Sequence, residues 1–221
     1  MYKNLKSTKK SDKKDSEKME FLFDTIYSAA GIKTNRIFDK DMQIKEVDIQ
    51  FLIKNKIINI EEKCAIKYWY KDLSTFCLEL WKNEFYPKGW FHDDAETLTD
   101  CYAFAYVRAD SKDLVTTNPS HFEVIIVKKN RLKKFLKTLG LKNSNEIIKE
   151  FNDLKKTKSL KQGKTGYYYY PIKDIKVMQC ANYKEAAINI IIPKKYLIEL
   201  ASFYAELHNG KIKIIKNLIN T

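Results

Sequence analysis

The stretch that most constrains the fold is residues 46–66, which predicts two neighbouring β-strands joined by a short polar turn. Apolar and polar side chains alternate from Val47 to Ile53, a pattern typical of a strand with one buried face. The turn is expected at residues 54–56, because Lys54, Asn55 and Lys56 interrupt the apolar pattern. If the two strands pair, one face of the hairpin carries four polar side chains: Asp48, Gln50, Glu61 and Lys63.

Carboxylates on a strongly hydrophobic hairpin are costly unless something pairs with them. A hard divalent cation such as Mg²⁺ is a suitable partner, because it prefers one or two carboxylates together with water and a phosphate oxygen. A lysine beside the metal, here Lys63, positions the attacking water or helps to deprotonate it. The alternative is an ordinary amphipathic hairpin with a solvated charged face.

The order Asp48 followed by Glu61-x-Lys63 on the next strand resembles the signature of the PD-(D/E)XK nuclease superfamily, which has the restriction-endonuclease-like fold. The proline that usually precedes the aspartate is replaced by Val47. The resemblance implies that Asp48 and Glu61 hold Mg²⁺, for which Mn²⁺ can substitute, and that Lys63 is catalytic. It also implies that the backbone carbonyl of Glu62 adds a metal ligand.

Two further residues are candidates for the same site. In many relatives an acidic residue on the first helix reaches the metal, which makes Glu20 a candidate, with a solvated helix face as the alternative. Gln50 is a candidate because it shares the polar face of the hairpin. The segment Gly89–Val107 also resembles one found in many of these nucleases. Its acidic residues are either extra ligands or part of a polar loop: Asp93, Asp94 and Glu96.

The formal charge of +13 and pI of about 9.3 indicate an anionic partner, and DNA is the partner we expect. The excess lies in residues 1–18 and 128–164, and the remainder of the chain is close to neutral. The alternative is that an AT-rich genome inflates the lysine count.

A lysine-rich loop at residues 155–166 is expected to bind the DNA phosphate backbone. Its lysines, together with the lysine after the second hairpin strand, form the predicted DNA-binding set: Lys67, Lys155, Lys156, Lys158, Lys161 and Lys164. The following tyrosines, Tyr167–Tyr170, either stack on exposed bases or form a strand with two faces.

The fold class expected is α/β, with a mixed central β-sheet flanked by helices and a restriction-endonuclease-like core that carries a C-terminal α/β elaboration. Residues 1–18 are expected to be a disordered basic tail. Residues 19–221 are expected to form a single domain, with its core over about 19–140 and the basic loop and elaboration over 141–221. After the hairpin the pattern predicts strands at about 101–107, 121–127 and 187–192, and leaves 211–219 open between strand and helix. Helices are predicted over about 16–30, 72–84, 129–139, 143–156 and 195–208.

The first eighteen residues contain no apolar run, and no apolar stretch approaches ~18 residues, so neither a secretory signal nor a membrane span is expected. The four cysteines are scattered without metal-site spacing, which favours buried, reduced thiols in a cytoplasmic protein.

These features together favour a Mg²⁺-dependent deoxyribonuclease, most readily a type II restriction-like endonuclease that acts as a homodimer on a palindrome. The alternatives are a structure-selective nuclease, such as a junction resolvase or repair nuclease, and a non-catalytic nucleic-acid-binding protein.

Overall fold

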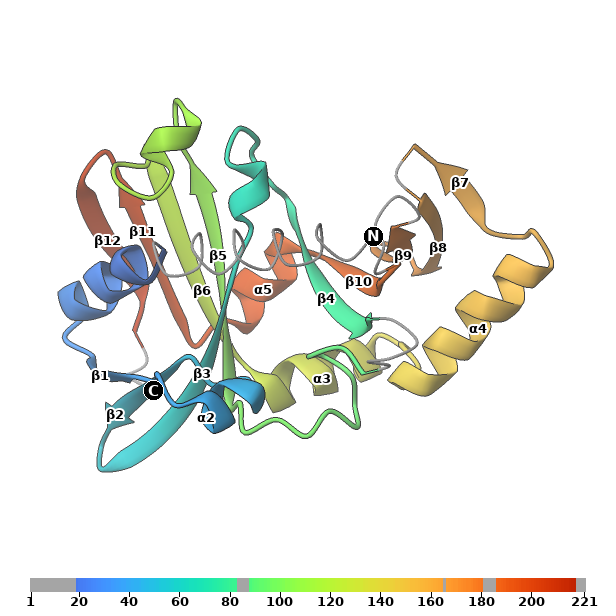
Figure 1. The fold of residues 1–221 in the computed structure, drawn as a ribbon, viewed down its shortest axis with the longest axis horizontal. Coiled ribbons are helices and arrows are strands. Elements are labelled where there is room, and N and C mark those ends of the chain that lie inside the picture. Colours follow the sequence, from blue (N-terminus) through green and yellow to red (C-terminus); the bar gives the residue numbers. More distant parts are fainter. Residues whose placement is uncertain (1–18, 83–87, 165, 181–185, 218–221) are drawn as a thin grey trace. The chain divides into compact units, whose positions relative to one another are not determined.

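The structure is a computed structural model that describes residues 19–82, 88–164, 166–180 and 186–217 (Figure 1). The predicted tail at residues 1–18 lies outside the described residues. The chain forms two compact units. Of the described residues, unit 1 contains those within Met1–Leu73, Thr99–Lys128 and Leu200–Thr221, and unit 2 contains those within Ser74–Leu98 and Lys129–Glu199. The expected single domain over 19–221 stays a prediction, and the division into units does not follow the expected boundary at about residue 140.

Unit 1 is built on a seven-stranded mixed sheet. Strands β3 and β5 are parallel, and every other neighbouring pair is antiparallel. In spatial order the strands are β1 (Lys33–Arg36), β2 (Ile49–Ile53), β3 (Lys56–Cys64), β5 (Cys101–Arg108), β6 (His121–Lys128), β11 (Phe203–His208) and β12 (Lys211–Lys216). The short helix α2 (Lys40–Ile44) and two 3₁₀ turns, Ile66–Tyr68 and Lys112–Leu114, connect the strands.

A helix over residues 19–29 covers one face of this sheet and closes the core of unit 1. Its aromatic residues pack edge-on against strand residues, with ring centroids 4.7 Å apart for Tyr27 and Phe51 and 5.3 Å apart for Phe23 and Phe122. All four rings are almost completely buried. Edge-to-face packing of this kind stabilises the fold beyond the burial of the rings. The face of β2 that carries Phe51 is therefore held against the helix.

The predicted hairpin of β2 and β3 is confirmed, with Ile53 opposite Lys56 and Gln50 opposite Asn59. Lys54 and Asn55 both have positive φ angles, 49° and 62°. Two consecutive left-handed residues make the turn that matches the natural twist of a two-residue hairpin. The turn therefore sets the register, and the register places the face of β3 that carries Glu61 and Lys63 on the same side of the sheet as Gln50 of β2.

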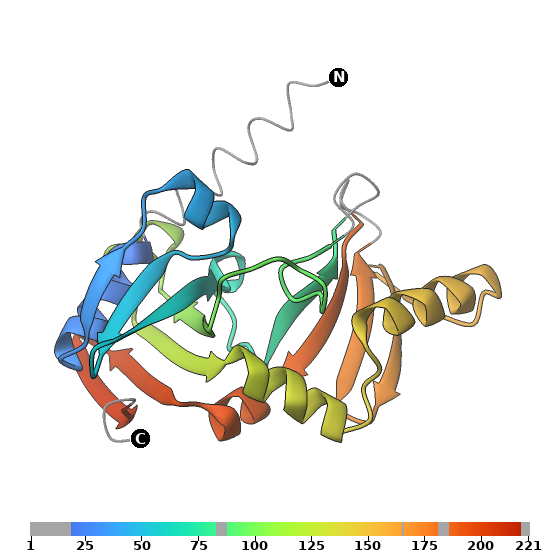
Figure 2. The same cartoon turned by 90° about the horizontal axis from the view of Figure 1, so that it is seen from below.

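Unit 2 contains a five-stranded antiparallel sheet and three helices. In spatial order its strands are β4 (Thr75–Trp81), β10 (Ile188–Pro193), β9 (Ile175–Cys180), β8 (Gly166–Ile172) and β7 (Lys161–Gly163), and its helices are α3 (Lys129–Thr138), α4 (Ser144–Lys156) and α5 (Lys194–Leu200). Helix α4 lies beside β8 and β9 (Figure 2), where Phe151 packs on Tyr169 and Lys155 bonds to Gln179.

The mixed α/β class is confirmed, with two sheets in place of one central sheet. The strands predicted at about 101–107, 121–127 and 187–192 are confirmed, as are the helices that begin near residues 129 and 143. Residues 211–216, left open, form a strand. Among the described residues, no helix is both long enough and apolar enough to cross a membrane.

Two predicted helices are wrong. Residues 75–81 form strand β4, in which Phe76, Leu78 and Leu80 are buried on alternate positions and the strand pairs with β10. The helix expected over 195–208 stops at Leu200, and Phe203–His208 becomes β11 between β6 and β12. In both segments the apolar residues satisfy either period, and pairing with strands distant in sequence decides the outcome.

Two smaller expectations are also corrected. The segment 155–166 is not a loop throughout, because it contains the end of α4 and all of β7. Not every cysteine is buried: Cys101 is buried, Cys64 is half-buried and Cys77 is exposed.

The backbone of Gly89, at the start of the segment Gly89–Val107, packs directly against strand β4. Its backbone N–H donates to the carbonyl of Leu80, and a Cβ at this position would lie 2.3 Å from the carbonyl oxygen of Glu79 in β4. Only glycine fits this close approach of two backbones.

We expect Gly89→Ala to lower the free energy of unfolding by about 1–3 kcal/mol, because the added methyl group displaces backbone atoms of β4. Chemical denaturation measures this. Lys88→Ala, at the exposed neighbouring position, is the control and should change stability by less than about 0.5 kcal/mol. Equal stability of the two variants would contradict the close approach.

Candidate functional site

The candidate site lies where the start of β2 meets the middle of β3. Asp48 directly precedes β2, and its backbone N–H donates to the carbonyl of Ile60 (3.0 Å). The side chain of Asp48 turns towards β3, where one carboxylate oxygen accepts the backbone N–H of Glu62 at 2.7 Å. Glu61 and Lys63 lie two residues apart in β3 and therefore share a face, the face on which Gln50 lies opposite Asn59.

Lys63 joins two carboxylates on this face. Its ammonium donates to the carboxylate of Glu61 and to that of Glu46, the latter at 3.2 Å. We call Glu46, Asp48, Glu61 and Lys63 the Lys63 cluster. Glu46 was not among the candidates from the sequence, although it lies two residues before Asp48, at the spacing that already grouped Asp48 with Gln50. In the sequence it reads only as the polar residue that precedes the strand.

Burial is the largest influence on the pKa values of Asp48, Glu61 and Lys63 in the Lys63 cluster. Burial raises the pKa of Glu61 well above its usual value; Lys63 opposes this, while Asp48 and Glu46 add to it. Burial likewise raises the pKa of Asp48, against the N–H of Glu62 and the ammonium of Lys63. Burial disfavours the Lys63 ammonium, but Glu61 and Glu46 outweigh burial and hold the pKa of Lys63 above its ordinary range. Lys63 is therefore a positive charge in this arrangement and not a neutral base.

A second cluster lies on the opposite face of β3. The side chain of Glu62 turns towards Arg36 of β1, with an oxygen 2.7 Å from the guanidinium. Arg36 also contacts Asp24, at 2.6 Å, and Glu20, at 3.9 Å. We call Glu20, Asp24, Arg36 and Glu62 the Arg36 cluster. Burial raises the pKa of Glu62 to about 7, with Arg36 opposing the rise.

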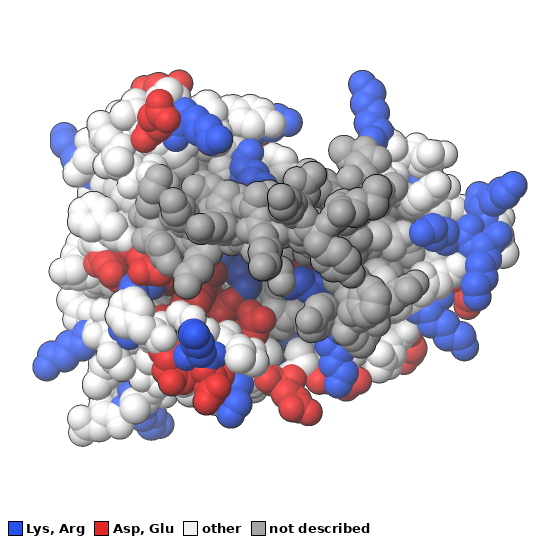
Figure 3. Space-filling model, viewed as in Figure 1, with Lys and Arg blue, Asp and Glu red and all other residues white. Residues whose placement is uncertain are grey.

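The predicted site residues thus divide between two places. Asp48, Glu61 and Lys63 come together. Glu20 instead contacts Arg36, and the helix spacing that brings it beside Asp24 was the available signal for that pairing. Gln50 lies in a chain of amides, bonded to Asn35 and Asn59, and not to the carboxylates. Acidic side chains gather over α2 and β3 (Figure 3).

The Lys63 cluster offers the oxygen donors that Mg²⁺ takes. Three carboxyl groups lie around one ammonium, and burial raises the pKa values of Asp48 and Glu61 by more than Lys63 lowers them, so a further cation would stabilise their ionised forms. By that observation the donor set fits a divalent cation, and the residues that would hold it are Asp48, Glu61 and the backbone carbonyl of Glu62. Among the described residues, however, no three His, Cys, Asp or Glu side chains lie together as a set of metal ligands.

The predicted DNA-binding lysines are placed on both units. Lys67 is exposed in the 3₁₀ turn after β3, in unit 1. The other five belong to unit 2. Lys155 is engaged with Gln179 and with the ring of Tyr167, and Lys156 lies 3.8 Å from Asp153 on the surface of α4. The remaining three are exposed at and after the end of α4: Lys158, Lys161 and Lys164.

Two acidic residues of the segment after Gly89, Asp93 and Asp94, have structural partners inside unit 2. Asp93 accepts the backbone N–H of Ser144 (2.8 Å) and its hydroxyl, and lies 3.5 Å from Lys133. Burial opposes ionisation of Asp93, but Ser144 and Lys133 outweigh it and lower its pKa. Asp94 accepts a hydrogen bond from Asn145 at the start of α4. These contacts favour the polar-loop interpretation of the segment.

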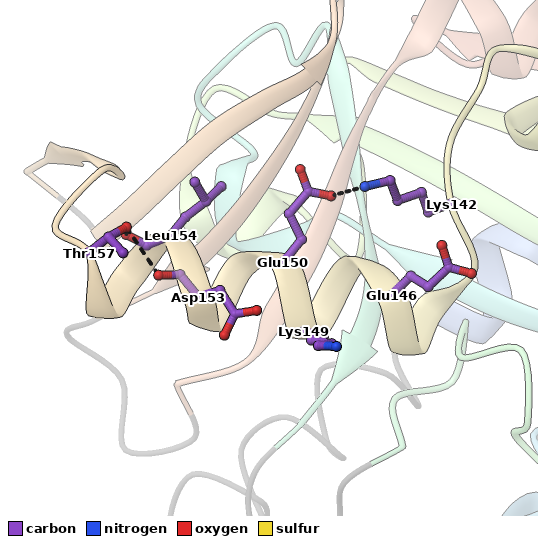
Figure 4. A pocket seen from close by; sticks show the side chains of 7 residues that line it. All are labelled: Lys142, Glu146, Lys149, Glu150, Asp153, Leu154 and Thr157. Carbon is purple, nitrogen blue, oxygen red and sulfur yellow. Dashed lines mark hydrogen bonds and ion pairs between the residues drawn. The ribbon is translucent and has the colours of Figure 1, made fainter.

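Two hollows lie on unit 2. One, of about 570 Å³, lies between this loop and α3 and is lined by residues that include Asp93, Lys129, Lys133 and Lys137. The other, of about 460 Å³, lies along α4. Two of its lining residues, Lys142 and Glu150, form an ion pair (Figure 4), with the ammonium nitrogen 2.9 Å from a carboxylate oxygen. Glu146 and Asp153 also line this second hollow, so its charge does not suit a phosphate group.

The chain matches no protein-family model, no curated protein and no solved structure. The geometry and electrostatics of the side chains therefore carry the functional argument.

The raised pKa values predict how stability depends on pH. An acid whose pKa is higher in the folded chain than in the unfolded chain holds an extra proton between those two values, so stability falls as pH rises. For Glu62 the window runs from about 4.5 to about 7, and Asp48 and Glu61 act in the same direction. We expect the free energy of unfolding to fall between about pH 4.5 and pH 7, with Glu62 contributing on the order of 3 kcal/mol.

Denaturation at several pH values measures this slope. Glu62→Gln should make it shallower, because the amide does not titrate and Arg36 keeps Asp24 as a partner. Glu150→Gln, on the surface of α4, should leave the slope unchanged. A free energy of unfolding that increases across this range would contradict the raised pKa values of these buried carboxyl groups.

Proposed function

We propose that this protein is a Mg²⁺-dependent deoxyribonuclease that hydrolyses phosphodiester bonds, with its active site at the Lys63 cluster. The observation that carries the proposal is the convergence of Asp48, Glu61 and Lys63 on one face of β3, with more buried carboxylate than Lys63 compensates. Buried groups with strongly perturbed pKa values are characteristic of functional sites. The restriction-endonuclease-like core is part of the same proposal.

Each residue has a separate role in the proposed reaction. Mg²⁺, held by Asp48 and Glu61 with the carbonyl of Glu62, would supply Lewis-acid activation of the phosphate and of water. Lys63, already an ammonium, stabilises the negative charge that develops on the phosphate and orients the attacking water. Glu46 accepts a second hydrogen bond from the Lys63 ammonium, and so acts as a positioning residue.

The frame of the site supports the proposal in part. Asp48, directly before β2, is joined to the β3 segment that carries Glu61 and Lys63 by the hydrogen bond from the Glu62 N–H. The helix over residues 19–29 lies on the opposite face of the sheet. One feature departs from the expected order, since a strand, β4, replaces the helix expected after the motif.

DNA is the proposed substrate because the chain carries a net charge of +13 and because Lys158, Lys161 and Lys164 are exposed at and after the end of α4. We favour a type II restriction-like enzyme that acts as a homodimer, and the alternative within nucleases is a structure-selective enzyme. Digestion of a plasmid separates them: discrete fragments support restriction, whereas cleavage of branched or damaged DNA alone supports structure selection.

We expect purified protein to nick or cut supercoiled plasmid DNA with Mg²⁺ or Mn²⁺ and to be inactive in EDTA. Lys63→Ala should lower the cleavage rate by at least about 100-fold, because one stabilising positive charge at the phosphate is lost. Glu61→Gln and Asp48→Asn should have similar effects, while DNA binding in a gel shift remains largely intact.

Lys56→Ala, at the exposed start of the same strand, is the matched control and should cut at the wild-type rate. If Lys63→Ala also cuts at the wild-type rate, the assignment of the active site is wrong.

A second candidate function is non-catalytic binding of nucleic acid. It is favoured by the state of Glu61, which is bonded to Lys63, and by the lack of three grouped side-chain ligands among the described residues. A gel shift that persists while no Mg²⁺ or Mn²⁺ concentration produces nicking would select this function.

A further inference from the structure

The sheet of unit 2 has one face turned away from α4, and tyrosine and lysine side chains gather on it. Along β8, Tyr169 packs on Phe151 of α4, so Tyr168 lies on the opposite face. The pairing with β9 is irregular between Tyr169 and Ile172, and the contact between the rings of Tyr170 and Tyr168 places Tyr170 on the same face as Tyr168. In the register with β7, Lys161 lies opposite Tyr168. In the register with β9, Met178 lies opposite Tyr168, which places Lys176 on the same face. We call Lys161, Tyr168, Tyr170 and Lys176 the Tyr–Lys face.

The two rings are held by each other and by the lysines. The centroids of Tyr168 and Tyr170 are 6.0 Å apart and their planes are nearly perpendicular. The ammonium of Lys161 lies 5.8 Å from the ring of Tyr170, and that of Lys176 lies 5.3 Å from the ring of Tyr168. Tyr170 is 52% exposed, and Lys161 is exposed as well. The face therefore presents at least one accessible ring beside fixed positive charge.

The charge of this region suits an anionic ligand. Strands β7, β8 and β9 contain no aspartate or glutamate, and the connecting segments add Lys164 and Lys173. The nearest acidic residue in the sequence, Asp174, is already paired with Lys195 at 2.6 Å. In Figure 3 basic side chains gather over the end of unit 2 that carries β7.

We propose that the Tyr–Lys face binds single-stranded nucleic acid, with bases stacked on Tyr170 and Tyr168 and the adjoining phosphates near Lys161 and Lys176. Every base has a π-face, so stacking on tyrosine tolerates any sequence, and each lysine neutralises backbone charge. A duplex keeps its base faces inside the stack and offers only phosphates to the same surface. The face therefore discriminates in favour of unpaired strands. This inference does not depend on cleavage.

Fluorescence anisotropy with labelled oligonucleotides tests the proposal, in EDTA so that no cleavage occurs. The probes are oligo-dT and oligo-rU of about 15 nucleotides, and a duplex of the same length. We expect at least one single strand to bind about tenfold more tightly than the duplex, and the comparison of dT with rU shows which sugar is preferred. Tyr170→Ala should weaken single-strand binding by about tenfold, and Tyr170→Phe should retain it, because stacking needs only the ring.

Tyr70→Ala is the matched control. Tyr70 is 58% exposed in unit 1 and has the ammonium of Lys71 5.1 Å from its ring, so it reproduces the same pair elsewhere. Lys161→Ala should make the salt dependence of single-strand binding shallower by roughly 0.7 in slope. Equal effects of Tyr170→Ala and Tyr70→Ala, or duplex binding as tight as that of both single strands, overturn the proposal. Because binding is measured in EDTA, where no cleavage occurs, loss of this surface is read independently of loss of cleavage.

Discussion

The structure of unit 1 depends on the charge carried by one strand, β3, on both of its faces. Glu61 and Lys63 project to one side and Glu62 to the other, and each cluster sets three carboxylates against a single cation. Lys63 serves one side and Arg36 the other. Removing ions from water is expensive, and one cation repays only part of that cost when three carboxylates surround it. The raised pKa values of Asp48, Glu61 and Glu62 are the direct consequence.

The two clusters differ in what they allow. Arg36 spreads its guanidinium over three partners and ties β1 to the helix over 19–29, an arrangement that serves to hold the fold together. Lys63 offers a compact charge on a flexible stem, and its ammonium contacts Glu61 and Glu46. A structural role suits the Arg36 cluster, and the proposed reaction suits the Lys63 cluster. The Tyr–Lys face of unit 2 adds a separate means of holding a strand of nucleic acid.

Sequence patterns were sufficient where local signals were strong. The alternation around Phe51 and the polar residues at the turn predicted the hairpin, and the two-residue spacing within the second strand placed Glu61 with Lys63. The patterns failed where two periods fitted equally well, as at Phe76–Leu80 and Phe203–Leu207, because pairing with distant strands decided those cases. Arg36 could not be assigned from the sequence, since nothing local indicates that β1 brings it beside Glu62. The spacing of Glu46 from Asp48 could have indicated its place in the cluster, but in the sequence Glu46 resembles any polar residue before a strand.

The most direct test of the central claim, that the Lys63 cluster carries uncompensated negative charge able to hold a divalent cation, is calorimetric titration of the protein with Mg²⁺ at pH 8. We expect saturable binding at one site per chain. Asp48→Asn should abolish it, whereas Glu150→Gln, which removes a carboxylate paired with Lys142 in unit 2, should leave it unchanged. Absence of saturable binding, or equal binding by the Asp48→Asn protein, would contradict the account.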